Sequence, residues 1–166
     1  MKLDRLIEDV YDQETDLAKQ LRVVAERHAA EHDMYHVGHA QARACAQRFE
    51  QLAPHAERYG LTPPKPPASE SSGLVEDLRH TTANLLGRTK PSGELLVHDL
   101  RQLYLNAQAT ELAWVILSQS ARAVRDPDLL TVATSGQEAV TVCAKWLRTR
   151  IKEAAPQVYA AGGPQG

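Results

Sequence analysis

Three glutamates are the residues of this chain best placed to do chemistry. Glu14, Glu111 and Glu138 each fall near the middle of a stretch whose apolar residues recur at helical spacing. Carboxylates in the middle of bundle helices are the groups from which a carboxylate-bridged metal site is built. A buried carboxylate without a partner is costly in free energy, so each glutamate that points inward needs a metal ion, a hydrogen-bond donor or a proton.

Two interpretations of these glutamates stay open. In the first, they form a reduced site, mononuclear in the simplest case, that takes Fe, Mn or Zn. In the second, they belong to a polar layer that fixes the helix register. The side chains expected to satisfy the carboxylates in that layer are Gln137, Arg48 or Tyr104.

Histidines form the second candidate site. The run HAAEHDMYHVGH holds four of the seven histidines, and His28, His36 and His39 are its candidate metal ligands. Imidazole suits Zn, Ni and Cu. In a bundle with a long crossover, the start of the third helix would bring Asp99 and its neighbours to the same end. The alternative is a set of solvated turn histidines.

Four long helices must position these residues. Apolar residues recur in four-three steps, as in a helix seam that packs on other helices, and they predict helices over 3–29, 33–59, 95–125 and 126–155. The first seam is Leu3, Ile7, Val10, Glu14, Leu17, Leu21, Val24 and His28. Glu14 therefore lies inside the seam, and Glu111 lies beside the seam of the third helix.

Local signals define the ends of these helices. Asp33, Ser92 and Asp126 are expected N-caps, Gly60 is an expected C-terminal cap, and Pro156 is expected to stop the fourth helix. The predicted domain is a single bundle over 1–155. It includes a proline-rich crossover over 61–91 with a short helix at 74–86, and a disordered tail over 156–166 follows it.

Tight turns inside each half and a long crossover between them predict an all-α four-helix bundle of two antiparallel hairpins. A ferritin-like topology, with helices two and three parallel, is favoured over a plain up-down-up-down bundle. The segments HDLRQLYLNAQATELAWVILSQSARAVRDPDLL and KWLRTRIKEAAPQ resemble bacterial members of the ferritin-like superfamily. Metal-binding members carry Glu-x-x-His on helices two and four, a motif that this chain lacks.

Composition and the absence of certain motifs argue against several classes of protein. The net charge of -2 argues against a nucleic-acid binder. No apolar run is long enough to span a bilayer, and two cysteines are too few for a disulfide framework. Gly-x-Ser-x-Gly and phosphate-binding glycine loops are absent from the sequence. We therefore expect a cytoplasmic protein without membrane contact.

These observations favour a non-catalytic bundle that acts as an accessory or protein-interaction protein with a degenerate metal site and no cofactor. The alternative is a metal-binding protein or metalloenzyme of the ferritin-like kind. We expect the partner to be a second copy or another protein. Small residues on the second helix and the apolar residues Leu95, Leu105 and Leu112 leave room for a partner helix.

Overall fold

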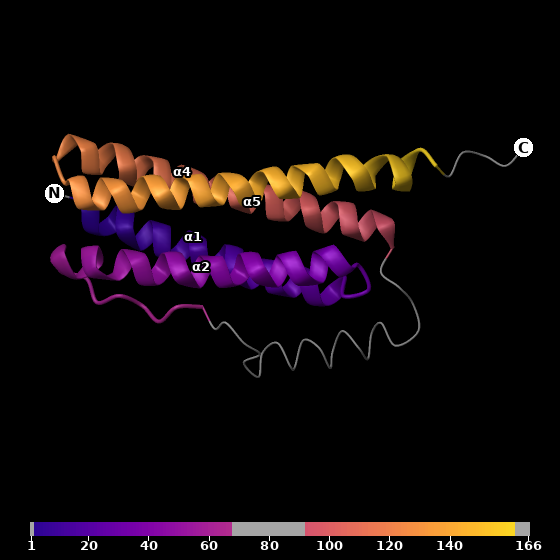
Figure 1. Ribbon diagram of the computed structural model, residues 1–166, viewed down its shortest axis with the longest axis horizontal. Coiled ribbons are helices and arrows are strands. Elements are labelled where there is room, and N and C mark those ends of the chain that lie inside the picture. Colours follow the sequence, from indigo (N-terminus) through magenta and orange to yellow (C-terminus); the bar gives the residue numbers. More distant parts are fainter. Residues whose placement is uncertain (1, 68–91, 162–166) are drawn as a thin grey trace, which may run out of the picture.

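The computed structural model is built from four long helices (Figure 1). The structure describes residues 2–67 and 92–161, and within these ranges it contains no strand. The helices are α1 (Leu3–Arg27), α2 (His32–Arg58), α4 (Gly93–Ala123) and α5 (Pro127–Tyr159). The prediction of an all-α protein is confirmed. In the described ranges, no helix is long and apolar enough to cross a membrane.

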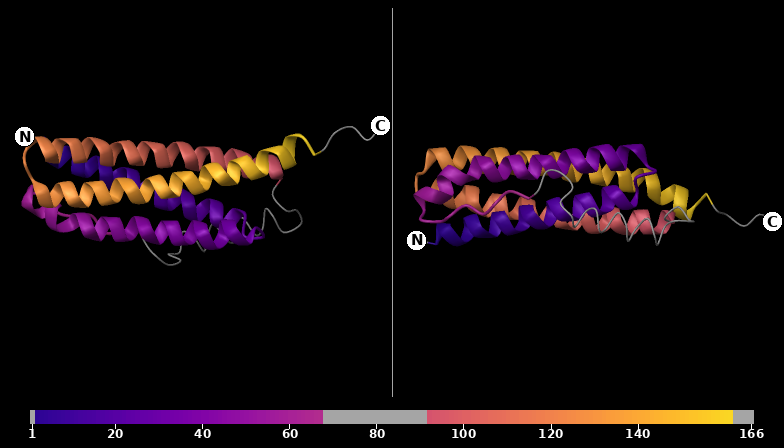
Figure 2. Two further views of the ribbon diagram at one scale, coloured as in Figure 1. Left: turned by 45° about the horizontal axis from the view of Figure 1, so that its top comes forward. Right: turned by 90° about the horizontal axis from the view of Figure 1, so that it is seen from below.

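The helices lie side by side in one bundle. α1 contacts α2 and α4, and α5 contacts α4 and α2, so α1 and α5 are diagonal neighbours. The chain runs from left to right in α1, returns in α2, runs leftward again in α4 and returns in α5 (Figure 1). α2 and α4 therefore point in the same direction. The views in Figure 2 show that the last turns of α5 extend beyond the other helices.

The core follows the predicted seams. All eight seam residues of α1, from Leu3 to His28, are buried. The inward positions of α4 from Leu96 to Ala121 are also buried, with Thr110 filling the gap in their spacing. Gly38 on α2 allows close approach of α1, because a Cβ atom there would lie 2.9 Å from Ala25 Cβ. The small face of α2 is therefore used inside the bundle and is not open to a partner.

Several helices carry the terminal caps that the sequence predicts. The Ser92 hydroxyl accepts from the backbone N–H of Leu95, and the Asp126 carboxylate accepts from that of Leu129. Gly60 ends α2 with φ of 81°, and the N–H of the next residue bonds to the Ala56 carbonyl, which is the pattern of a Schellman motif.

Most predicted helix bounds differ from the structure by one or two residues, and two of the predicted end signals, the N-cap Asp33 and the stop at Pro156, are wrong. α2 begins at His32 with Glu31 as its N-cap residue, two positions before the expected start after Asp33, and no side chain caps it. α5 passes Pro156 and ends at Tyr159. Packing explains the second difference, because Val158 lies against Gly93 at the start of α4 and holds the last turn of α5 in place.

The first part of the predicted crossover is described. Residues 61–67 contain no helix or strand and pass along α1, near Tyr11 at their start and beside Arg22 at their end, where the guanidinium donates to the Pro67 carbonyl at 3.5 Å. The rest of the 61–91 crossover, including the predicted helix at 74–86, lies outside the described residues, as does the tail over 162–166.

Candidate functional site

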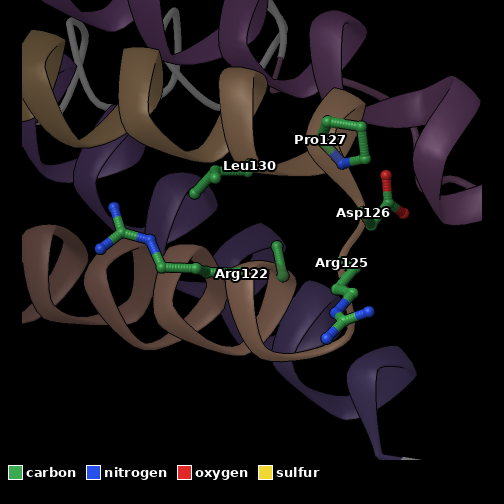
Figure 3. Close-up of a pocket in the computed structure, with 6 residues that line it drawn as sticks. Arg122, Arg125, Asp126, Pro127 and Leu130 are labelled. Atoms are coloured by element: carbon green, nitrogen blue, oxygen red, sulfur yellow. The ribbon is translucent and has the colours of Figure 1, made fainter.

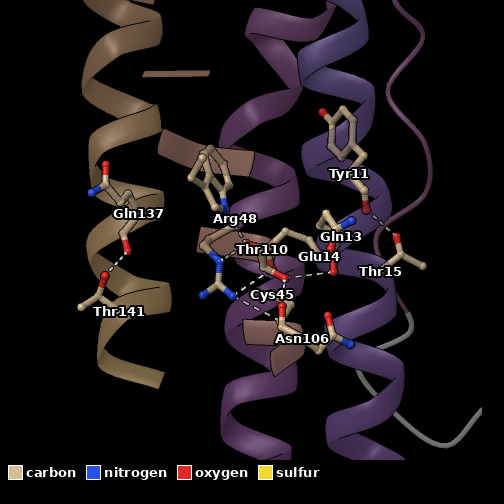
Figure 4. Close-up of polar contacts among 11 residues, drawn as sticks. Tyr11, Gln13, Glu14, Thr15, Cys45, Arg48, Asn106, Thr110, Gln137 and Thr141 are labelled. Carbon is tan, nitrogen blue, oxygen red and sulfur yellow. Dashed lines mark hydrogen bonds and ion pairs between the residues drawn. The ribbon is translucent and has the colours of Figure 1, made fainter. Parts of the chain in front are cut away.

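A buried ion pair lies at the middle of the bundle. Arg48 on α2 donates from Nε to Glu14 Oε1 at 2.5 Å and from Nη2 to Glu14 Oε2 at 2.8 Å (Figure 4). Both side chains are buried, with 5% and 1% of their surfaces exposed. The two bonds form a bidentate fork, the strongest geometry for a guanidinium and a carboxylate.

Trp114 completes this layer from α4. Its indole Nε1 donates to Glu14 Oε1 at 2.7 Å, so the carboxylate accepts three hydrogen bonds from two helices. The other side of the indole faces Gly136 on α5, where a Cβ atom would lie 2.7–2.8 Å from three ring atoms. A glycine is needed there because the ring lies directly against the α5 backbone. One layer thus joins all four helices.

The charges of this layer act on the two cysteines. Burial alone would lower the pKa of Arg48, but the hydrogen bonds and charge of Glu14 outweigh it and raise that pKa. Burial and the nearby Glu14 carboxylate raise the pKa of the Cys45 thiol well above its ordinary value. Burial raises the pKa of Cys143 to about 11. Both thiols are therefore protonated near neutral pH and act as small apolar groups.

The other two predicted carboxylates lie elsewhere. Glu111 is half-buried and accepts from the Thr141 hydroxyl at 3.0 Å, while Glu138 is exposed on α5. Among the described residues, neither carboxylate bonds to the Glu14–Arg48 pair. The structure therefore does not bring Glu14, Glu111 and Glu138 together as a ligand set. In residues 2–67 and 92–161, no group of three or more His, Cys, Asp or Glu side chains could hold a metal ion.

A second polar cluster lies where the α1–α2 turn meets the start of α4. Asp99 is buried and accepts from Arg27 Nη1 at 2.8 Å on both oxygens, and its Oδ2 lies 2.7 Å from His28 Nε2. Burial alone would raise the pKa of Asp99, but the hydrogen bonds from His28 and Arg27 outweigh it and lower that pKa. The sequence placed Asp99 near this end, but its histidine partner is His28 and not His36 or His39.

The remaining histidines of this end interact in pairs. His39 Nε2 lies 3.0 Å from Glu26 Oε1 across the α1–α2 hairpin. His36 is exposed, and its ring lies 4.3 Å from the His32 ring and 5.1 Å from the Tyr35 ring, centroid to centroid. The three predicted ligands are thus distributed over separate contacts: His28 on Asp99, His39 on Glu26, and His36 against the rings of His32 and Tyr35.

Two surface pockets lack the convergent polar side chains that a reaction centre needs. The first, of about 300 Å³, lies at the α4–α5 turn (Figure 3). Its Arg122 and Arg125 side chains extend in different directions. Its Asp126 carboxylate already accepts from Arg58, Tyr59 and a backbone N–H. The second pocket, of about 320 Å³, lies beside residues 61–64 and is lined by Glu8, Tyr11 and Asp12 on α1.

Sequence reasoning missed Trp114 and Arg27 as polar partners. The helical spacing of α4 places Trp114 on the buried face, and a buried indole N–H usually finds an acceptor. A buried tryptophan in the same core as a buried glutamate was therefore the available signal. Arg27 sits in the last turn of α1 with no local indication that it would reach Asp99 on α4. No family model, curated protein or solved structure matches the chain in the comparisons.

Proposed function

We propose that this protein is a ferritin-like helical bundle that acts as a non-catalytic accessory or interaction protein in the cytoplasm. The observation that carries the proposal is the buried Glu14–Arg48 pair. Glu14 matches the position where a metal-binding bundle of this kind keeps a ligand on its first helix. Here the carboxylate is matched by a guanidinium of the same chain.

The arrangement of the helices supports the ferritin-like part of the proposal. α2 and α4 run in the same direction (Figure 1), as they do when a crossover traverses the bundle. Residues 61–67 pass from the region of Tyr11 toward Arg22, so the crossover starts along the length of α1. A plain up-down-up-down bundle would instead keep its second and third helices antiparallel.

Electrostatics argue against a cation beside Glu14. A guanidinium keeps its proton at any physiological pH, and the pKa of Arg48 is raised further by Glu14. A metal ion at this carboxylate would meet a fixed positive charge in a medium of low dielectric constant, where like charges repel strongly. It would also displace the Trp114 indole N–H from Glu14. The layer therefore suits a structural role in holding four helices in register.

Metal analysis of untagged protein tests the proposal. Cells are grown with added Fe, Mn and Zn, and we expect less than about a tenth of an equivalent of any of them in the purified protein. Close to one equivalent of metal would overturn the proposal. Loss of that metal in Glu14→Gln would assign it to the middle of the bundle. Loss in a variant with His28, His36 and His39 each changed to Gln would assign it to the bundle end.

A further inference from the structure

Residues 61–67 lie outside the four helices, at the edge of the bundle (Figure 1). Their sequence is LTPPKPP, in which four of the last five residues are proline. Pro64, Lys65 and Pro66 are exposed, whereas Pro63 and Pro67 are half-buried. The middle of the segment is therefore accessible at the surface of the protein.

Covalent geometry fixes the backbone of this segment. Each proline ring holds its own φ near -65°, and each residue that precedes a proline is restricted to extended conformations. In TPPKPP every residue is a proline, precedes a proline, or does both. Both restrictions favour the polyproline II helix, which has three residues per turn and no internal hydrogen bonds. In agreement, residues 61–67 contain neither α-helix nor strand.

A polyproline II helix distributes these side chains over three edges. Because the helix repeats every three residues, Pro63 and Pro66 share one edge. Pro64 and Pro67 share the second edge, and Lys65 lies on the third. The segment therefore contains Pro-x-x-Pro twice, in overlapping registers. That spacing is the one bound by the aromatic-lined grooves of SH3, WW and EVH1 domains.

We propose that residues 63–67 are the docking segment for a partner protein that binds polyproline II through aromatic-lined grooves. The grooves take the proline rings of the two proline edges, and Lys65 on the third edge stays in water. Little conformational entropy is lost on binding, because the proline rings have already ordered the ligand. An anionic membrane surface fits the segment less well, since it attracts clusters of several basic residues and the segment holds one lysine.

The segment is only weakly attached to the bundle. In the described part of the chain, one hydrogen bond joins residues 62–67 to a helix, from Arg22 Nη2 to the Pro67 carbonyl, and at 3.5 Å it is long. A pocket of about 320 Å³ lies between the start of the segment and α1. The half-buried sides of Pro63 and Pro67 can therefore turn toward a partner without breaking close packing.

This inference rests on the proposed interaction role and names the chemistry of the partner, but the two can fail separately. Metal content tests the role of the mid-bundle layer, and binding of proline-recognition domains tests the segment. The full chain is titrated by calorimetry with a panel of purified SH3, WW and EVH1 domains. We expect at least one domain to bind with a Kd below about 100 µM. Failure of every domain to bind at that level would overturn the proposal.

Variants of the full chain locate the binding site. Pro64→Ala together with Pro67→Ala removes one proline edge and relaxes the backbone, so it should weaken binding at least about tenfold. The circular dichroism spectrum should stay unchanged, because these two residues belong to no helix. Pro54→Ala is the matched control, since Pro54 is an exposed proline inside α2, and it should keep the wild-type affinity. Wild-type affinity in the double variant, or an equal loss in Pro54→Ala, would contradict the proposal.

Lys65 separates proline recognition from charge attraction. Because its side chain lies on the third edge, Lys65→Ala should change the affinity by less than about threefold. Raising the salt concentration from about 50 to 500 mM should likewise have little effect, since salt screens charges and not apolar contacts. A loss of affinity in Lys65→Ala that exceeds the loss in the double proline variant would refute proline recognition, because charge would then carry the binding.

Discussion

Removing the Arg48 side chain tests the central layer most directly. Arg48→Met keeps most of the volume of the side chain but leaves the Glu14 carboxylate buried, with the Trp114 N–H as its remaining donor. Breaking one side of a buried ion pair costs about 3–5 kcal/mol in the free energy of unfolding. For a chain of this size that corresponds to a fall in Tm of roughly 6–20 °C. Urea and thermal denaturation, followed by circular dichroism at pH 7, measure both.

The double variant shows whether the cost comes from the unpaired charge. Glu14→Gln together with Arg48→Met removes both charges and keeps an amide oxygen for the Trp114 N–H. We expect it to recover about 2 kcal/mol or more of the loss, since replacing both members of a buried pair is often nearly neutral. Arg58→Met is the matched control, because Arg58 is 49% exposed where it pairs with Asp126, and it should cost under about 1 kcal/mol. Two results would refute the reasoning. One is a loss below about 1 kcal/mol in the free energy of unfolding of Arg48→Met. The other is a double variant whose loss equals the sum of the losses of the two single variants.

Three further predictions concern packing, pH and thiol chemistry. Gly136→Ala should lower the free energy of unfolding by about 1–3 kcal/mol, because the alanine Cβ overlaps the Trp114 ring and this outweighs the better helix propensity of alanine. Urea unfolding measures the loss, and an unchanged urea midpoint would contradict the prediction. Asp99 has a lowered pKa, so its stabilisation is present above the ordinary value of 3.8 and is lost as the pH falls through its lower folded value. The stability difference between wild type and Asp99→Asn should therefore shrink on acidification from pH 7 to pH 2, and a constant difference would contradict it. At pH 8 the native protein should release almost no colour with Ellman's reagent, because Cys45 and Cys143 are buried and protonated, and two equivalents should appear in urea.

The helices and their buried faces were predictable because they depend on local spacing. A four-three repeat defines one face of a helix, and all eight seam residues of α1 are buried. That repeat also placed Glu14 inside the core. The N-caps Ser92 and Asp126 followed from short-range chemistry between a side chain and backbone N–H groups two or three residues ahead.

Arg48 was among the side chains expected to satisfy the carboxylates, and it does pair with Glu14. The other polar partners depended on distant contacts that spacing does not determine. Glu14 and Trp114 are 100 positions apart, and Arg27 and Asp99 are 72 apart. A periodic pattern shows which face is buried, but the long arginine side chains can turn toward several neighbours. The expected end of α5 failed for a similar reason, since contact with α4 outweighs the local effect of Pro156.

Trp114 holds α4 against two of its neighbouring helices. Its indole holds Glu14 on one side and lies on Gly136 on the other, so α4 is held against both α1 and α5 at the same level. The buried Glu14–Arg48 pair and the Trp114 indole together therefore fix the position of α4 in the bundle.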